Sequence, residues 1–135
     1  MKRATAYRFW ISDLSRGDYS QGTGMDNPTF VKIGELKVSR VDIMGKVSEK
    51  TDSGQYSAMV VQDKTGKIRV KAFSEVYQAA KDITDGSLVR VIGKIRQDEA
   101  GRLIVGEIIK KMDDTNYAVL REKELGQPSV EEISF

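Results

Sequence analysis

The chain contains neither cysteine nor histidine among its 135 residues. Without cysteine it has no disulfide framework and no thiolate nucleophile, and without histidine it lacks the commonest metal ligand and general base. The acidic pairs Asp113-Asp114 and Glu131-Glu132 are adjacent in sequence rather than spaced around a site. We therefore expect a binding protein that is not an enzyme, with no cofactor and no metal.

Long apolar runs and a strong charge imbalance are also missing. No apolar run approaches the roughly 18 residues of a membrane span, and the start, Met1-Lys2-Arg3, lacks the apolar stretch of a signal peptide. Lys and Arg exceed Asp and Glu by only 22 to 20. The length suits a single domain, and we expect a soluble, intracellular protein whose contact with any nucleic acid depends on where the cations lie.

The most informative stretch is a predicted β-hairpin. Residues 56–62 and 67–73 alternate in character on either side of the polar turn Asp63-Lys64-Thr65-Gly66. In the second strand one face carries Ile68, Val70 and Ala72, and the other carries Lys67, Arg69, Lys71 and Phe73. Cations and a ring suit the phosphates and bases of a single-stranded nucleic acid. The same pattern also fits a solvated charged strand whose Phe73 covers the core.

Three further segments place one glycine inside an apolar strand: Ile43-Met44-Gly45-Lys46-Val47, Val91-Ile92-Gly93-Lys94-Ile95 and Ile104-Val105-Gly106-Glu107-Ile108. A glycine within a strand marks a bulge or sharp bend, such as those that close a sheet into a barrel. These segments therefore predict a barrel.

The predicted order is strands over residues 38–49, 56–62 and 67–73, a helix, and strands over 88–97 and 103–112. Ser74 is the predicted helix cap, Asp85-Gly86 the stop, and the apolar stripe is Val76, Ala79, Ala80 and Ile83. This order predicts an all-β fold, a single five-stranded OB-fold barrel with a helix between strands 3 and 4. Such barrels bind oligonucleotides on strands 2 and 3 and in the loops after strands 1 and 4.

The ends of the chain add to this barrel. Residues 6–14, A-Y-R-F-W-I-S-D-L, predict an added N-terminal strand whose Trp10 is either packed or exposed to a partner. Residues 16–27 predict an irregular loop and residues 28–33 a short extended piece. Residues 116–125 predict a C-terminal helix. The predicted parts are residues 1–37, strand and loop packed on the barrel; 38–112, barrel; 113–126, C-terminal helix; and 127–135, a flexible acidic tail.

Four segments carry a resemblance to a known family: A-Y-R-F-W-I-S-D-L at 6–14, S-R-V-D-I-M-G-K-V at 39–47, D-K-T-G-K-I-R-V-K-A-F at 63–73 and L-V-R-V-I-G-K-I at 88–95. Together they resemble archaeal replication protein A, in particular its middle-subunit-like and associated OB-fold proteins, over most of residues 5–125. The hairpin also resembles the DNA-binding OB domains of the large eukaryotic subunit, which implies that Arg69 engages phosphate or base and that Phe73 stacks on a base. The family's second stacking ring has no aromatic counterpart here, and Leu103 lies nearest to its place.

Two functions follow as hypotheses. The first is a single-stranded DNA-binding protein of replication and repair, located in the cytoplasm with the nucleoid. Its predicted nucleic-acid-binding residues are Lys50, Tyr56, Lys64, Lys67, Arg69, Lys71, Phe73, Arg96 and Arg102. The second is an assembly subunit that binds little DNA itself and docks to other replication protein A-like subunits. In relatives the helix after the barrel joins an intersubunit bundle, which implies partner contacts by Tyr117, Leu120 and Leu125. An RNA ligand stays open as well.

Overall fold

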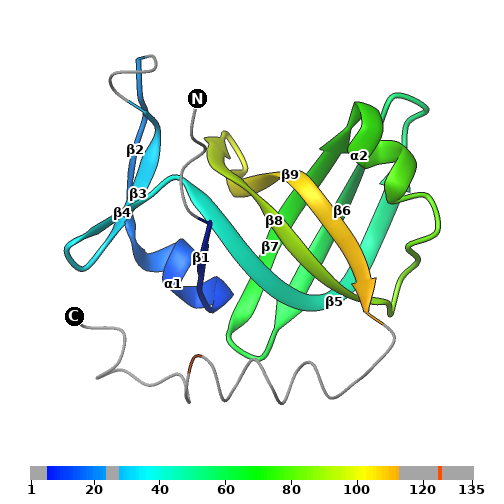
Figure 1. The fold of residues 1–135 in the computed structure, drawn as a ribbon, viewed down its shortest axis with the longest axis horizontal. Helices are drawn as coiled ribbons and strands as arrows, with labels where there is room; N and C mark the ends of the chain where they lie inside the picture. Colours follow the sequence, from blue (N-terminus) through cyan, green and yellow to red (C-terminus); the bar gives the residue numbers. More distant parts are fainter. Residues whose placement is uncertain (1–5, 24–27, 113–124, 126–135) are drawn as a thin grey trace.

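The computed structural model describes residues 6–23, 28–112 and 125, and it shows a closed β-barrel with a small three-stranded sheet beside it (Figure 1). The barrel strands are β5 (Arg40–Asp52), β6 (Tyr56–Asp63), β7 (Gly66–Phe73), β8 (Leu88–Asp98) and β9 (Gly101–Met112). They pair in the order β5-β6-β7-β9-β8, and β8 pairs back to β5. The short helix α2 (Ser74–Ala79) lies between the third and fourth barrel strands. The predicted OB-fold is confirmed.

Alternation along the strands builds the core. In β7, Ile68, Val70 and Ala72 are buried, whereas the side chains between them face outwards, as predicted. Ala80 and Ile83, which follow α2, join the same core cluster. Two details of the predicted helix are wrong. Ala79 is exposed and Tyr77 is buried in its place, because α2 is only six residues long. Ser74, the predicted cap, makes no capping hydrogen bond.

Glycines lie where barrel strands bend or approach closely. Gly93 pairs with Gly106 at a register shift between β8 and β9, which leaves Glu107 as the extra residue of a bulge. Gly45 packs so tightly on β6 that a Cβ there would overlap the carbonyl oxygen of Gln62. The backbone therefore requires glycine at these strand positions.

The N-terminal segment differs from the single strand predicted for residues 6–14. It forms β1 (Ala6–Arg8), parallel to β5, and then α1 (Ile11–Arg16). The amide nitrogens of Ile11 and Ser12 donate to Asp63 Oδ2 at 2.9 Å and to Thr65 Oγ1 at 3.0 Å, so that the β6–β7 turn satisfies the first turn of α1. Trp10 is only 7% exposed, which resolves the two alternatives in favour of packing.

The irregular loop predicted over residues 16–27 is also partly wrong. It contains β2 (Asp18–Ser20), which pairs with β3 (Phe30–Ile33), and β3 pairs in turn with β4 (Leu36–Val38). Residues 18–20 lie among turn-forming residues, yet they form a strand because pairing with β3 supplies their backbone hydrogen bonds. The predicted C-terminal helix and tail, with Tyr117 and Leu120, lie outside the described residues, apart from Leu125.

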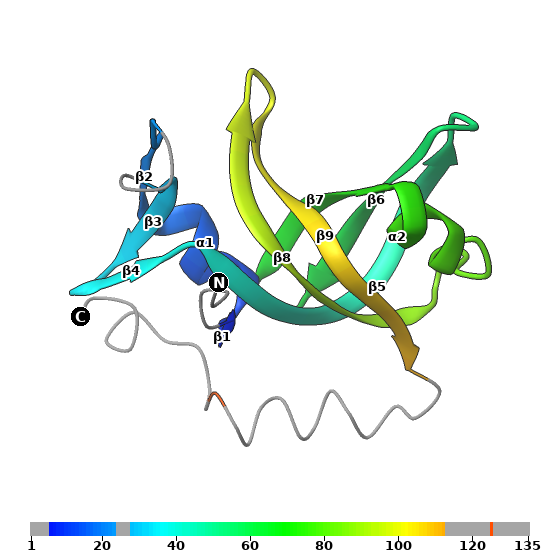
Figure 2. The same cartoon turned by 45° about the horizontal axis from the view of Figure 1, so that its top comes forward.

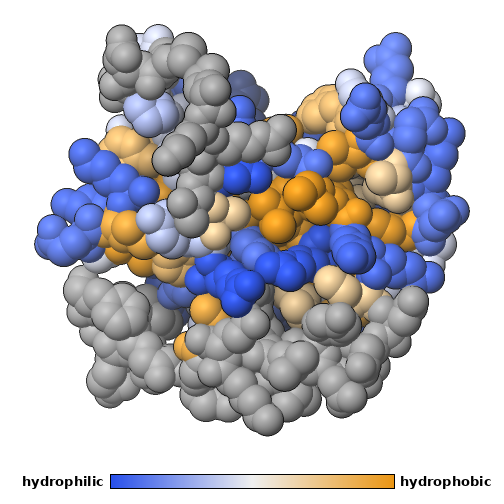
Figure 3. Space-filling model, viewed as in Figure 1, coloured by the Kyte–Doolittle hydropathy of each residue, from blue (hydrophilic) through white to orange (hydrophobic). Residues whose placement is uncertain are grey.

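Two hairpins rise from the barrel and frame its outward face. Figure 2 shows the tips of the β5–β6 and β8–β9 hairpins on either side of β6 and β7. A second surface has a different character. Apolar side chains gather over the middle of β9 and towards α2, bordered by a hydrophilic band (Figure 3), and Ile108 of β9 is 48% exposed. No helix within the described ranges is long and apolar enough to cross a membrane.

Candidate nucleic-acid interface

The outward side chains of β6 and β7 form a surface that we call the floor: Tyr56, Lys67, Arg69, Lys71 and Phe73. Antiparallel pairing places Tyr56 opposite Phe73, and the three cations follow at every second residue of β7. Parallel pairing with β9 places Leu103 beside Arg69. The structure thus brings five of the nine predicted binding residues together.

Two aromatic rings lie at one end of the floor. The rings of Tyr56 and Phe73 are stacked, with centroids 5.3 Å apart and an interplanar angle of 29°, and Phe73 is 43% exposed. Lys71 Nζ lies 5.8 Å from the centroid of the Tyr56 ring. An exposed ring such as that of Phe73 can stack on a base, and the neighbouring cation can hold its phosphate.

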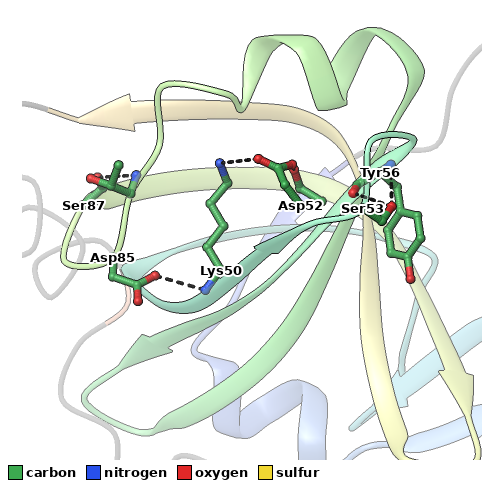
Figure 4. A network of polar contacts seen from close by, with 8 residues as sticks. Lys50, Asp52, Ser53, Tyr56, Asp85 and Ser87 are labelled. Carbon is green, nitrogen blue, oxygen red and sulfur yellow. Dashed lines mark hydrogen bonds and ion pairs between the residues drawn. The ribbon is translucent and has the colours of Figure 1, made fainter.

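The β5–β6 turn positions Tyr56. Ser53 donates from its backbone nitrogen and its Oγ to the Tyr56 carbonyl oxygen, at 3.0 Å and 3.1 Å, and Gly54 adopts φ +90°. Figure 4 shows the Tyr56 ring directed away from Lys50. Lys50 itself is held elsewhere: its Nζ lies 3.8 Å from Asp52, and only 9% of its side chain is exposed.

A groove of about 530 Å³ occupies the other end of the floor. Its base is formed by β6 and β7, and its walls by the β8–β9 hairpin and the end of α1. The lining residues are Ser15, Val60, Lys67, Ile68, Arg69, Gln97, Ala100, Gly101 and Arg102. The N-terminal segment was not predicted to form a wall of the site.

Arg69 reaches across this groove to the β8–β9 hairpin. Its two terminal nitrogens donate to the two carboxylate oxygens of Asp98 at 2.9 Å and 2.6 Å, and one of them also donates to the Gly101 carbonyl oxygen at 2.9 Å. The hydrogen bonds from Arg69 lower the pKa of Asp98 to about 2 from an ordinary value of 3.8. The same hydrogen bonds raise the pKa of Arg69.

Asp98 was not predicted as a site residue. It lies 29 residues from Arg69, and the two meet only because the barrel closes through the β7–β9 pairing. The sequence shows Asp98 as a turn residue, a role that it also fills, since its Oδ1 accepts a hydrogen bond from the Ala100 nitrogen at 2.9 Å.

The other predicted cations are engaged with the protein. Arg102 donates to the Leu14 carbonyl oxygen at 2.5 Å and lies 6.0 Å from the Tyr19 ring, so that it links β9 to the N-terminal segment. Arg96 donates to the Ile95 carbonyl oxygen at 2.7 Å. Lys64 lies in the turn between β6 and β7, with its Nζ 5.2 Å from the centroid of the Trp10 ring. Among the described residues, no group of three or more acidic side chains could hold a metal ion.

A closed five-stranded barrel with a helix between its third and fourth strands, and with cations and rings on strands 2 and 3, defines an OB-fold protein with the surface of a nucleic-acid binder. A family model described as an OB-fold nucleic acid binding domain matches residues 41–111. The chain belongs to this family. No protein of curated function matches it significantly in sequence.

Solved structures extend the likeness beyond the barrel. A chain of the S. pombe Stn1-Ten1 complex superposes with a TM-score of 0.75 at 15% identity, over 90% of this chain and 89% of that one. A chain of a replication protein A heterotrimer bound to ssDNA superposes with a TM-score of 0.72 at 18% identity, over 90% and 93%. A third structure is asparaginyl-tRNA synthetase from Pyrococcus horikoshii complexed with asparaginyl-adenylate. It superposes with a TM-score of 0.50 at 22% identity, over 69% of this chain and 23% of that one. At such identities the likeness shows the fold.

Proposed function

We propose that this chain is a single-stranded DNA-binding protein of the replication protein A type, acting without catalysis in DNA replication and repair. The observation that carries the proposal is the exposed ring of Phe73, stacked on the half-buried ring of Tyr56 at the end of a row of cations. Membership of the OB-fold family supports a nucleic-acid ligand. A neighbour of similar length, a chain of a replication protein A heterotrimer bound to ssDNA, supports the choice of DNA.

The floor suits a single strand for a physical reason. Base stacking on an aromatic side chain contributes about 1 to 3 kcal/mol per base, and it needs bases that are not already paired. The net charge is only +2, so attraction of phosphates depends on Lys67, Lys71 and Arg69 lying in one row. The proposal places the protein in the cytoplasm with the nucleoid.

The test is a titration of a fluorescent oligo-dT of about 30 nucleotides at several salt concentrations. We expect submicromolar binding that weakens with salt, with a log-log slope of about −0.7 per phosphate neutralised. Phe73→Ala should weaken binding about 5-fold to 100-fold, the equivalent of one stacked base. The matched control is Tyr7→Ala, because Tyr7 is an aromatic of similar exposure, 37%, outside the floor.

Two results would count against this function. A binding constant that does not change with salt would exclude phosphate neutralisation as a source of affinity. Equal affinities for Phe73→Ala, Tyr7→Ala and the unchanged protein would exclude stacking on the ring pair.

A second function, an assembly subunit, is favoured by a different set of observations. Arg69 and Arg102 already bind protein groups, and Leu103 stands where a second stacking ring is expected from the family. The exposed apolar surface over β9 suits contact with another protein (Figure 3). In this alternative the partners are other replication protein A-like subunits, and the C-terminal helix predicted over residues 116–125 makes the contact.

The same titration separates the two functions. A folded protein that binds oligo-dT negligibly at low salt favours the assembly subunit. Deletion of residues 114–135 should then abolish the complex with the partner subunit and leave the barrel's thermal unfolding in place. A complex that survives the deletion contradicts the alternative.

A further inference from the structure

The carboxylate of Asp98 engages Arg69, one of the residues that line the groove, as a bound anion would. It is held by a two-pronged contact with Arg69, in which each carboxylate oxygen accepts from one terminal nitrogen. A phosphate of a nucleic acid offers two oxygens in a similar geometry, and it is a preferred partner of this planar group. Asp98 and the phosphate therefore compete for the same donors.

We infer that Asp98 is an internal competitor of the ligand: its carboxylate binds Arg69 in the free protein, and a backbone phosphate replaces it when single-stranded DNA binds. The inference rests on the proposed function and adds a residue that sets the affinity of the site. Binding then has two coupled parts: Arg69 leaves Asp98, and the tip of the β8–β9 hairpin loses this side-chain bridge to β7, while the backbone pairing of β7 with β9 stays.

Two further observations support an exchange rather than a permanent bridge. The ion pair lies at the surface, since 31% of the Arg69 side chain and 40% of the Asp98 side chain are exposed. Solvent-exposed ion pairs are weak, so that a multivalent anion can displace one. Asp98 also lies near a second cation of the floor, because the charge of Lys71 contributes to its lowered pKa. A phosphate that took the place of this carboxylate would therefore face the same two cations, Arg69 and Lys71.

The variant Asp98→Asn tests the exchange. Asparagine keeps an Oδ1 acceptor for the Ala100 nitrogen and removes the charge that holds Arg69. We expect binding of oligo-dT to strengthen about 2-fold to 5-fold at low salt, because Arg69 no longer has to leave a charged partner. Asp98→Ser serves as a second variant with a short oxygen acceptor, should the asparagine variant fold poorly.

The matched control is Glu99→Gln. Glu99 is the next residue of the same hairpin turn, so the substitution changes the net charge by the same amount, whereas Arg69 is paired with Asp98. We expect it to change affinity less than 2-fold. Equal effects of the two variants would reduce the Asp98 effect to general charge and overturn the inference. Weaker binding by Asp98→Asn would also overturn it, because Asp98 would then position Arg69 for the ligand.

A double variant isolates the contact. In an Arg69→Gln background there is no guanidinium to release, so adding Asp98→Asn should give no gain beyond that of Glu99→Gln. A full gain in this background would contradict the competition.

A readout without DNA separates this inference from the proposed function. Inorganic tripolyphosphate is added while the Arg69 Nε–H signal is followed by NMR. We expect the signal to move at lower tripolyphosphate concentration in Asp98→Asn than in the unchanged protein or in Glu99→Gln. If oligo-dT fails to bind but this order holds, the proposed function fails and the competition stands. An identical response in all three proteins overturns the competition.

Discussion

Replacement of Gly45 by alanine should destabilise the barrel. Gly45 lies in β5, opposite Val89 of β8 and against β6. A Cβ at this position would lie 2.7 Å from the Gln62 carbonyl carbon and 2.9 Å from Val61 Cγ1, and it would overlap the Gln62 carbonyl oxygen. Backbone atoms of a paired strand cannot rotate away as a side chain can, so β5 and β6 must separate.

The magnitude follows from two opposing effects. Overpacking of an interior costs about 1 to 3 kcal/mol, and contact with backbone belongs to the upper part of this range. Alanine gives the unfolded chain less conformational freedom than glycine does, and this offsets about 0.4 to 1 kcal/mol of the cost. We expect a net decrease of about 2 kcal/mol in the free energy of unfolding, which for a chain of this length lowers the melting temperature by about 8 °C.

The assay is urea unfolding followed by circular dichroism, with Gly66→Ala as the control. Gly66 begins β7, and a Cβ there would meet only Ile11 Cγ2, at an ordinary 3.8 Å. Both variants remove one glycine, so that the unfolded-state effect is shared and the difference measures the crowding at Gly45. Equal unfolding midpoints for the two variants would refute the crowding argument.

Two further predictions concern charge. Asp42→Asn should lower the free energy of unfolding, measured in urea, by about 3 kcal/mol, because the Asp42 side chain is 4% exposed and Arg90 would keep an unbalanced charge. Asp82→Asn, at an exposed site, is the control. Equal decreases in the free energy of unfolding for the two variants would contradict the reasoning. The pKa of Asp98, about 2, should be visible by NMR of its carboxyl carbon and should rise towards 3.8 in Arg69→Gln. Because the folded pKa lies below the unfolded one, the stabilisation by this pair is complete above about pH 4 and is lost as the pH falls through 2; an unchanged midpoint in Arg69→Gln would contradict it.

Local patterns were sufficient for the barrel. Alternation in β7 predicted which of its side chains are buried, and the turn at residues 63–66 predicted the hairpin, because both depend on neighbours within a few residues. Glycines inside strands predicted the bulge at Gly93 and Gly106. Gly45 instead lies where β5 approaches β6 too closely for a side chain.

Contacts between distant segments caused the errors. Residues 11–16 have strand-forming aromatics before them, yet they form a helix because Asp63 and Thr65 accept from its first amides. The segment containing β2 is rich in turn residues and becomes a strand through pairing with β3. The residues of the floor follow from alternation along β6 and β7, which is local. The contact of Arg69 with Asp98 and the wall at Ser15 depend instead on how distant segments meet when the barrel closes.

The wall at Ser15 has a consequence for how such proteins diversify. The family model covers residues 41–111, but one side of the groove belongs to α1, and Arg102 is held there by the Leu14 carbonyl oxygen. The barrel supplies the base, and a segment outside the shared domain supplies part of the rim. Two proteins with nearly identical barrels can therefore differ in the width of the groove and in the ligands that they bind. The difference would come from the N-terminal segment, which a comparison of the shared domain does not align.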